Sequence, residues 1–129
     1  MRDDELVEAA RAAAERSYSP YSGFRVGAAL VAADGTVYTA ANVENASYPV
    51  SSCAEATVVN YAAAQGVRKI DTVAVACIDA DDPEDAYPCG RCRQIMAEFD
   101  VERILVTTAG GDVRVHTLDE LLPHRFRLR

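Results

Sequence analysis

The sequence predicts an α/β fold, a three-layer α/β/α sandwich around a mixed five-stranded sheet. Residues 71–78 and 103–108 are nearly continuous apolar runs, as expected for strands buried on both faces. A helical pattern at residues 90–99 separates them, and a helix between two such strands implies parallel pairing. Asp34-Gly35 links two further strand-like segments and is a strong hairpin signal, so an antiparallel pair should make the sheet mixed.

Local patterns place the other elements. Residues 5–16 repeat apolar side chains at helical spacing, and the loop after them is rich in Ser, Pro and Gly. Ser51 or Ser52 can cap a helix at 53–65, and Gly66 can end it. Strands are expected at 24–32 and 36–41, followed by a polar irregular segment at 42–52. An acidic loop is expected at 79–85, a short strand at 113–115 and a helical turn at 118–122.

Length and composition indicate a single domain spanning residues 1–129. The chain is 50% hydrophobic and 26% charged, which fits one compact core. Its net charge of −7 offers no basic surface to a phosphate backbone, so the composition argues against nucleic acid and leaves a small neutral substrate open. A charged N-terminus without a signal-peptide pattern, and no bilayer-length apolar stretch, predict a cytoplasmic protein without membrane contact.

Three of the four cysteines have the spacing of a zinc site. Cys53 starts one predicted helix, and Cys89 and Cys92 start another, where the partial positive charge favours the metal-binding thiolate. If the two helices lie side by side, three thiolates can hold one Zn²⁺ per subunit and leave its fourth position to water. Glu55, two residues after Cys53, can move protons beside that position. Arg91 or Arg93 is a candidate to offset the negative charge of the thiolates.

Simpler interpretations of these cysteines stay open. An isolated Cys-x-x-Cys is often a redox pair or half of a structural zinc site. A redox pair would leave Cys53 and Glu55 unexplained. A four-cysteine structural site would need Cys77, which lies inside an apolar strand and is expected to be a buried core residue. The pattern of Cys-x-Glu followed by Pro-Cys-x-x-Cys is instead the signature of zinc-dependent base deaminases.

Longer motifs covering essentially the whole chain resemble the cytidine deaminase family, in its small homotetrameric zinc-dependent form. The similar segments are Tyr18-Ser19-Pro20-Tyr21-Ser22-Gly23-Phe24-Arg25-Val26-Gly27-Ala28-Ala29-Leu30, Asn42-Val43-Glu44-Asn45-Ala46-Ser47-Tyr48, Pro88-Cys89-Gly90-Arg91-Cys92-Arg93-Gln94, and Leu121-Leu122-Pro123 with Phe126. The resemblance implies hydrolytic deamination of cytidine and 2′-deoxycytidine in pyrimidine salvage. It also implies that Cys53, Cys89 and Cys92 bind zinc and that Glu55 is the proton shuttle.

The same resemblance assigns the nucleoside contacts. Asn42 and Glu44 match residues that hydrogen-bond the ribose 3′-hydroxyl, Phe24 matches the aromatic that packs on the pyrimidine, and Ala54 matches a backbone contact to the base. On the residues alone, Asn42 and Glu44 can equally form a solvated turn, and Phe24 can be core. The two histidines are interpreted as surface or interface residues.

Three further matches imply a homotetramer whose active sites are completed by neighbouring subunits. Ala46 and Tyr48 match residues that reach across a subunit interface, and Phe126 matches an aromatic delivered from a neighbour. Phe126 can also be a plain oligomer contact.

Two departures from the family pattern leave the substrate preference open. Pro49-Val50-Ser51-Ser52 stands where the family usually has Gly-Leu-Thr, and proline changes the path available to that loop. Ala56 stands where many relatives have an arginine that offsets the thiolate charge, which makes Arg91 the more interesting cation. The rival substrate is a related aminopyrimidine nucleoside such as blasticidin S. The rival class is a non-catalytic, zinc-stabilised nucleoside-binding module, against which Glu55 argues.

Overall fold

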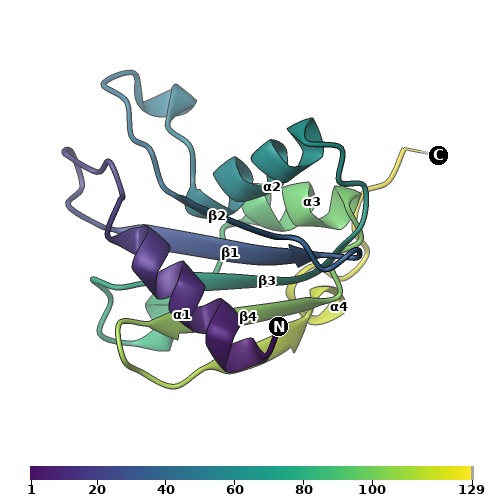
Figure 1. Cartoon of the computed structure of the whole chain (residues 1–129). Coiled ribbons are helices and arrows are strands. Elements are labelled where there is room, and N and C mark those ends of the chain that lie inside the picture. Colours follow the sequence, from purple (N-terminus) through teal and green to yellow (C-terminus); the bar gives the residue numbers. More distant parts are fainter. Residues whose placement is uncertain (129) are drawn as a thin grey trace.

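A computed structural model describes residues 1–128 and confirms the predicted sandwich (Figure 1). One five-stranded sheet has the strand order β2-β1-β3-β4-β5. Only the central pair, β3 and β4, is parallel; the other three neighbouring pairs are antiparallel. The described elements are α1 (Asp3–Ala14), β1 (Val26–Ala32), β2 (Val37–Ala41), η1 (Tyr48–Val50), α2 (Ala54–Ala64), β3 (Ile70–Cys77), η2 (Pro83–Ala86), α3 (Gly90–Glu98), β4 (Arg103–Thr108), β5 (Arg114–Thr117) and α4 (Leu118–Leu121).

The structure differs from the sequence-based expectation at several element ends. Helix α1 starts at Asp3, earlier than predicted, because the Glu5 carboxylate accepts the backbone N–H of Arg2 at 3.0 Å and satisfies one free donor of the first turn. The two segments expected to be irregular each contain one short 3₁₀ turn, η1 and η2, with proline in its first turn. The last strand runs from Arg114 to Thr117, later than expected.

The two faces of the sheet pack very differently. Helix α1 covers one face, where the sheet presents small side chains such as Ala29, Ala74 and Ala76. At Gly27 the helix lies so close that an added Cβ would be 2.0 Å from the Ala10 carbonyl oxygen. Only glycine fits there, so the sequence of β1 sets how closely α1 approaches.

Helices α2 and α3 lie on the opposite face and bring the chemistry with them (Figure 1). Here the strands present larger residues, including Leu30, Val73 and Ile104, all fully buried. The two helices run in the same layer, as the convergence of their cysteines requires. No helix within residues 1–128 has both the length and the apolar character needed to cross a bilayer.

Candidate active site

The cysteines predicted as ligands lie at the first turns of two neighbouring helices. Cys53 is the N-cap of α2, and Cys89 is the N-cap of α3. Cys92 follows in the first turn of α3 and is fully buried. Each cap residue keeps an extended backbone while the next residue begins the helix, so both cap cysteines are placed beside backbone N–H groups that favour negative charge.

The three sulfur atoms form one cluster, all within 4.8 Å of one another. Sulfurs that share a zinc ion at about 2.3 Å lie about 4 Å apart in a tetrahedron. The cluster is therefore already close to the geometry of a three-thiolate site. A set of soft sulfur donors with no carboxylate among them suits zinc better than calcium or magnesium.

The thiols are electrostatically prepared to bind a cation. The pKa of Cys53 falls to about 6, mainly because the Cys92 thiol donates to its sulfur, with a smaller contribution from the Cys89 thiol and the positive charge of Arg91. The pKa of Cys92 is raised for the same reason, since it keeps the shared proton, and burial raises it further. A divalent cation would displace that proton, as is usual when thiols become metal ligands.

Arg91 and Arg93 differ in what they can do for the metal site. The charge of Arg91 helps lower the pKa of Cys53. The guanidinium of Arg93 instead donates to the Pro88 carbonyl at 2.8 Å and the Leu121 carbonyl at 2.6 Å, and so ties α3 to α4. Of the two arginines, Arg91 is the one positioned to offset thiolate charge.

Glu55 lies in the first turn of α2 with only 5% of its surface exposed. Burial raises the pKa of its carboxyl to about 7, helped by the negative charge of Cys53. A carboxyl with such a pKa can both accept and release a proton near neutrality. Cys77, also nearby, is 4% exposed and burial raises the pKa of its thiol to about 12. Cys77 is thus a buried thiol outside the sulfur cluster, as predicted.

One cavity of about 300 Å³ brings most of the predicted site together. This volume is at the lower end of the range for small-molecule sites. The predicted residues that line it come from the end of the first loop, the segment after β2 and the starts of α2 and α3: Phe24, Asn42, Glu44, Cys53, Ala54, Glu55 and Cys89.

Asn42 and Glu44 are held in place by bonds to the loop that leads into β1. The Asn42 side-chain oxygen accepts the backbone N–H of Val26 at 3.0 Å and the Ser17 hydroxyl, while its NH₂ donates to the Phe24 carbonyl at 2.9 Å. Among residues 1–128, its second N–H has no bonded partner. Glu44 accepts the hydroxyl and the backbone N–H of Ser22, and these bonds hold its pKa below its usual range. A donor and an ionised acceptor therefore lie together at the cavity.

Three residues assigned through the resemblance lie elsewhere. Tyr48 is 70% exposed and lines a neighbouring cavity of about 400 Å³, which also includes Ser22 and Glu44. Ala46 is exposed. Phe126 is 69% exposed, and its backbone carbonyl accepts the Gln94 amide at 3.1 Å. None of the three lines the cavity with the thiols, so their assigned roles stay predictions.

The structure adds cavity residues that the sequence reasoning did not find. The segment after β3 contributes Asp85, Ala86 and Tyr87 to the lining. The Tyr87 hydroxyl is 2.7 Å from Nε2 of His116 on β5, so His116 anchors a wall of the cavity and is more than a surface residue. Asp79, expected in a solvated acidic loop, is bound by Arg25 instead. These pairs are distant in sequence and have no local motif.

Comparisons with known proteins agree on one family. The model for the "Cytidine and deoxycytidylate deaminase zinc-binding region" matches residues 1–108. A cytidine deaminase of Sporosarcina psychrophila is 41% identical over 128 residues, covering 98% of this chain and 92% of the relative. One from Halalkalibacterium halodurans is 44% identical over 123 residues, 94% of this chain and 91% of the relative.

A solved structure gives the same result. The chain superposes on the crystal structure of cytidine deaminase from Burkholderia pseudomallei with a TM-score of 0.91 and 45% identity, covering 98% of this chain and 100% of that chain. A blasticidin-S deaminase of Bacillus cereus is more distant, with 27% identity over 131 residues, 98% of this chain and 93% of the relative.

Proposed function

The chain belongs to the zinc-binding family of cytidine and deoxycytidylate deaminases, and we propose that it hydrolyses cytidine and 2′-deoxycytidine. The products are uridine or 2′-deoxyuridine and ammonia. The observation that carries the proposal is that Glu55, buried and with a pKa near neutrality, lines the same cavity as Cys53 and Cys89 of the sulfur cluster. A structural zinc site has no need of such a carboxyl.

Cys53, Cys89 and Cys92 would hold one zinc ion per chain. When bound, zinc supplies a polarised water of lowered pKa at its fourth position. Glu55 would take a proton from this water and deliver it to N3 of the pyrimidine as the water oxygen bonds to C4. It would then pass the remaining hydroxyl proton to the amine, which leaves C4 as ammonia. Such transfers are most efficient with a carboxyl whose pKa lies near the working pH, and burial raises the pKa of Glu55 in that direction.

The remaining cavity residues would bind the nucleoside. Phe24 offers a ring to the pyrimidine face, and the backbone of Ala54 offers a polar contact to the base edge. The free N–H of Asn42 and the carboxylate of Glu44 suit a sugar hydroxyl, which both donates and accepts. Their fixed bonds to the first loop support this role, because groups already held in place lose little entropy on binding.

We also propose a homotetramer in which neighbouring copies complete each site, working as a single-domain enzyme of pyrimidine salvage in the cytoplasm. The exposed Tyr48 and Phe126 support it, because large aromatic side chains on a monomer surface often mark an interface.

Side-by-side turnover tests the proposal. Cytidine, 2′-deoxycytidine, cytosine and blasticidin S are each incubated with the zinc-loaded chain, and ammonia release is measured. Cytidine and 2′-deoxycytidine should turn over fastest. The Glu55→Gln variant should keep its zinc and lose about 10²–10⁴-fold in kcat.

Each alternative predicts a different result. Preference for blasticidin S would replace the substrate assignment. Nucleoside binding without ammonia release from any substrate would indicate a non-catalytic module. Near-wild-type turnover by Glu55→Gln would refute the proton-shuttle role.

A further inference from the structure

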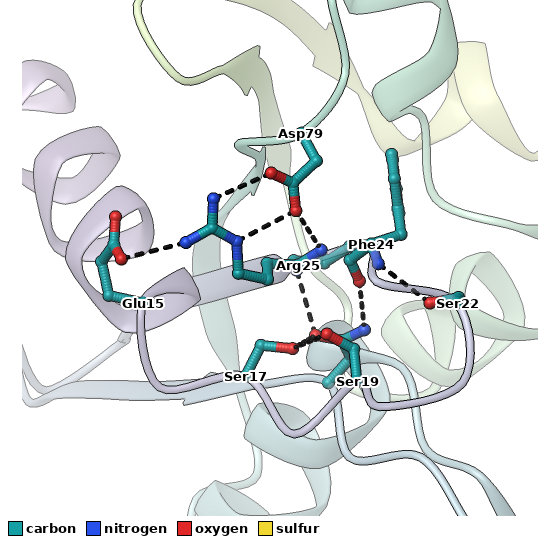
Figure 2. A network of polar contacts seen from close by, with 9 residues as sticks. Glu15, Ser17, Ser19, Ser22, Phe24, Arg25 and Asp79 are labelled. Atoms are coloured by element: carbon teal, nitrogen blue, oxygen red, sulfur yellow. Dashed lines mark hydrogen bonds and ion pairs between the residues drawn. The ribbon is translucent and has the colours of Figure 1, made fainter.

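Arg25 and Asp79 join two walls of the cavity where β1 and β3 meet. Asp79 Oδ2 accepts the backbone N–H of Arg25 at 2.8 Å and its Nε at 3.0 Å, while Oδ1 accepts from Nη2 at 2.8 Å (Figure 2). Nη1 donates to Glu15, just after α1, at 3.2 Å. One carboxylate thus fixes both the main chain and the side chain of Arg25.

The pair continues the sheet by one step beyond its last backbone bonds. Val26 pairs with Cys77, and the Ile78 N–H donates to the Arg25 carbonyl at 3.2 Å. The next acceptor, for the Arg25 N–H, is the carboxylate of Asp79 rather than a backbone carbonyl. From Asp79 the chain leaves the sheet and forms the segment that lines the cavity and ends at Cys89.

On the other side of the pair is Phe24, whose backbone is bonded at both ends. Its N–H donates to the Ser22 hydroxyl at 3.0 Å, and its carbonyl accepts the Asn42 NH₂ at 2.9 Å. Figure 2 shows the Phe24 ring extending away from these polar groups; Phe24 is among the residues that line the cavity. Because Arg25 is the next residue, its bond to Asp79 links the Phe24 wall to the segment that leads to residues 85–87.

We propose that Arg25 and Asp79 are a positioning pair that sets the spacing between Phe24 and residues 85–87, and thereby the fit of the pyrimidine ring. The inference rests on the proposed function. Both side chains are partly exposed, 41% and 27%, and such ion pairs contribute little to folding stability. The two side-chain bonds and the added backbone bond instead hold Arg25 in one orientation relative to Asp79. Poor positioning weakens substrate binding in ground and transition states alike, which raises KM and leaves kcat unchanged.

Kinetics of Asp79 variants test the pair. Asp79→Ala should raise KM for cytidine about tenfold, change kcat less than about twofold and keep a full complement of zinc. Asp79→Asn should raise KM less, because its amide oxygen can still accept the Arg25 N–H. If Asp79→Ala does not fold, Asp79→Asn is measured in its place. The matched control is Asp3→Asn, which removes the similarly exposed Arg103–Asp3 pair and should leave KM unchanged.

A second background shows whether the effect passes through Phe24. In Phe24→Ala, where no ring remains to be positioned, Asp79→Ala should change KM by less than about twofold. Wild-type KM in Asp79→Ala, or an equal rise of KM in both backgrounds, would overturn the positioning role.

Calorimetric titration with uridine repeats the comparison without turnover and should show the same tenfold loss of affinity. If the wild type releases no ammonia but binds uridine, the proposed function fails and the pair is judged on affinity alone. If the wild type neither turns over cytidine nor binds uridine, both fail.

Discussion

The thiol end of the cavity and the aromatic residues assigned to a subunit interface are built in opposite ways. At the thiol end, Cys92 is fully buried, Glu55 is 5% exposed, and three sulfurs already lie within 4.8 Å of one another. Outside this cavity, Tyr48 and Phe126 are 70% and 69% exposed and line no part of it. The cysteines and Glu55 are fixed at the starts of α2 and α3. Tyr48 instead lies in the segment after β2, and Phe126 in the C-terminal segment after α4. A single chain therefore brings the thiols and Glu55 together by itself, whereas the roles of Tyr48 and Phe126 rest on the proposed homotetramer.

The largest effect should come from the thiol end. Cys89→Ala should lose zinc and lower turnover more than about a thousandfold, because zinc supplies several kcal/mol of transition-state stabilisation. Cys77→Ala is the matched control, since Cys77 lines the same cavity but its thiol stands outside the cluster. It should keep zinc and most activity. Zinc content per chain and initial rates decide, and zinc loss from Cys77→Ala would contradict a three-sulfur site.

The second prediction concerns the proposed contact between Glu44 and the sugar. Glu44→Gln should lower kcat/KM for cytidine about tenfold or more, because a hydrogen bond to an ionised carboxylate is worth about 1.5–3 kcal/mol. Cytosine, which has no sugar, should be affected little if it reacts at all. Glu98→Gln removes the same charge from the exposed end of α3 and serves as control. Equal losses on cytidine and cytosine would argue against a sugar contact.

Phe126 tests the proposed contact from a neighbouring copy. If a neighbouring copy supplies this ring, Phe126→Ala should raise KM about fivefold, the equivalent of about 1 kcal/mol of lost apolar contact. Leu128→Ala, at an even more exposed apolar position, should not. Size-exclusion chromatography beside the kinetics shows whether assembly is kept. An unchanged KM in an intact oligomer would mean that the Phe126 ring does not contact the substrate.

The smallest effect is expected from the Arg25–Asp79 pair, on thermal stability. Hydrogen bonds from Arg25 lower the pKa of Asp79 from its ordinary value of 3.8 to about 2. Because the folded-state pKa is depressed, the stabilisation is fully present above about pH 4 and is lost as the pH falls toward 2. Asp79→Asn should lower Tm by about one degree at pH 7, because the pair is partly exposed and screened by solvent, and the two Tm curves should converge near pH 2. Parallel curves over this range would contradict the linkage.

Local sequence signals were sufficient for most of the fold and for the metal centre. Apolar runs, the Asp34-Gly35 turn and the cysteine spacing act over a few residues, and each element they predict is present. Element ends were less accurate, as at α1, where a side chain of the first turn recruits two more residues. The thiols converge because both motifs sit at helix starts on one face.

Contacts between distant segments could not be read the same way. Arg25 and Asp79 are 54 residues apart, and Tyr87 and His116 are 29 apart. Each pair meets only after β1, β3, β4 and β5 are in register. One signal was available: Arg25 lies at the second position of the strand predicted at 24–32 and Asp79 directly follows the strand predicted at 71–78, and antiparallel neighbours bring such ends together. Without knowing that these two strands pair, the sequence alone did not distinguish Asp79 from its acidic neighbours.

The glycine at position 27 has a consequence for engineering this protein. It lies in β1, three residues beyond Phe24, and its missing side chain lets the backbone of α1 touch β1. A library that changes position 27 would push strand and helix apart, and Phe24 would move with the strand. Substitutions at position 27 should therefore be poorly tolerated, although this position faces α1 and not the cavity. Variants with altered substrate range are better sought in the Pro49–Ser52 loop, which can change without disturbing that contact.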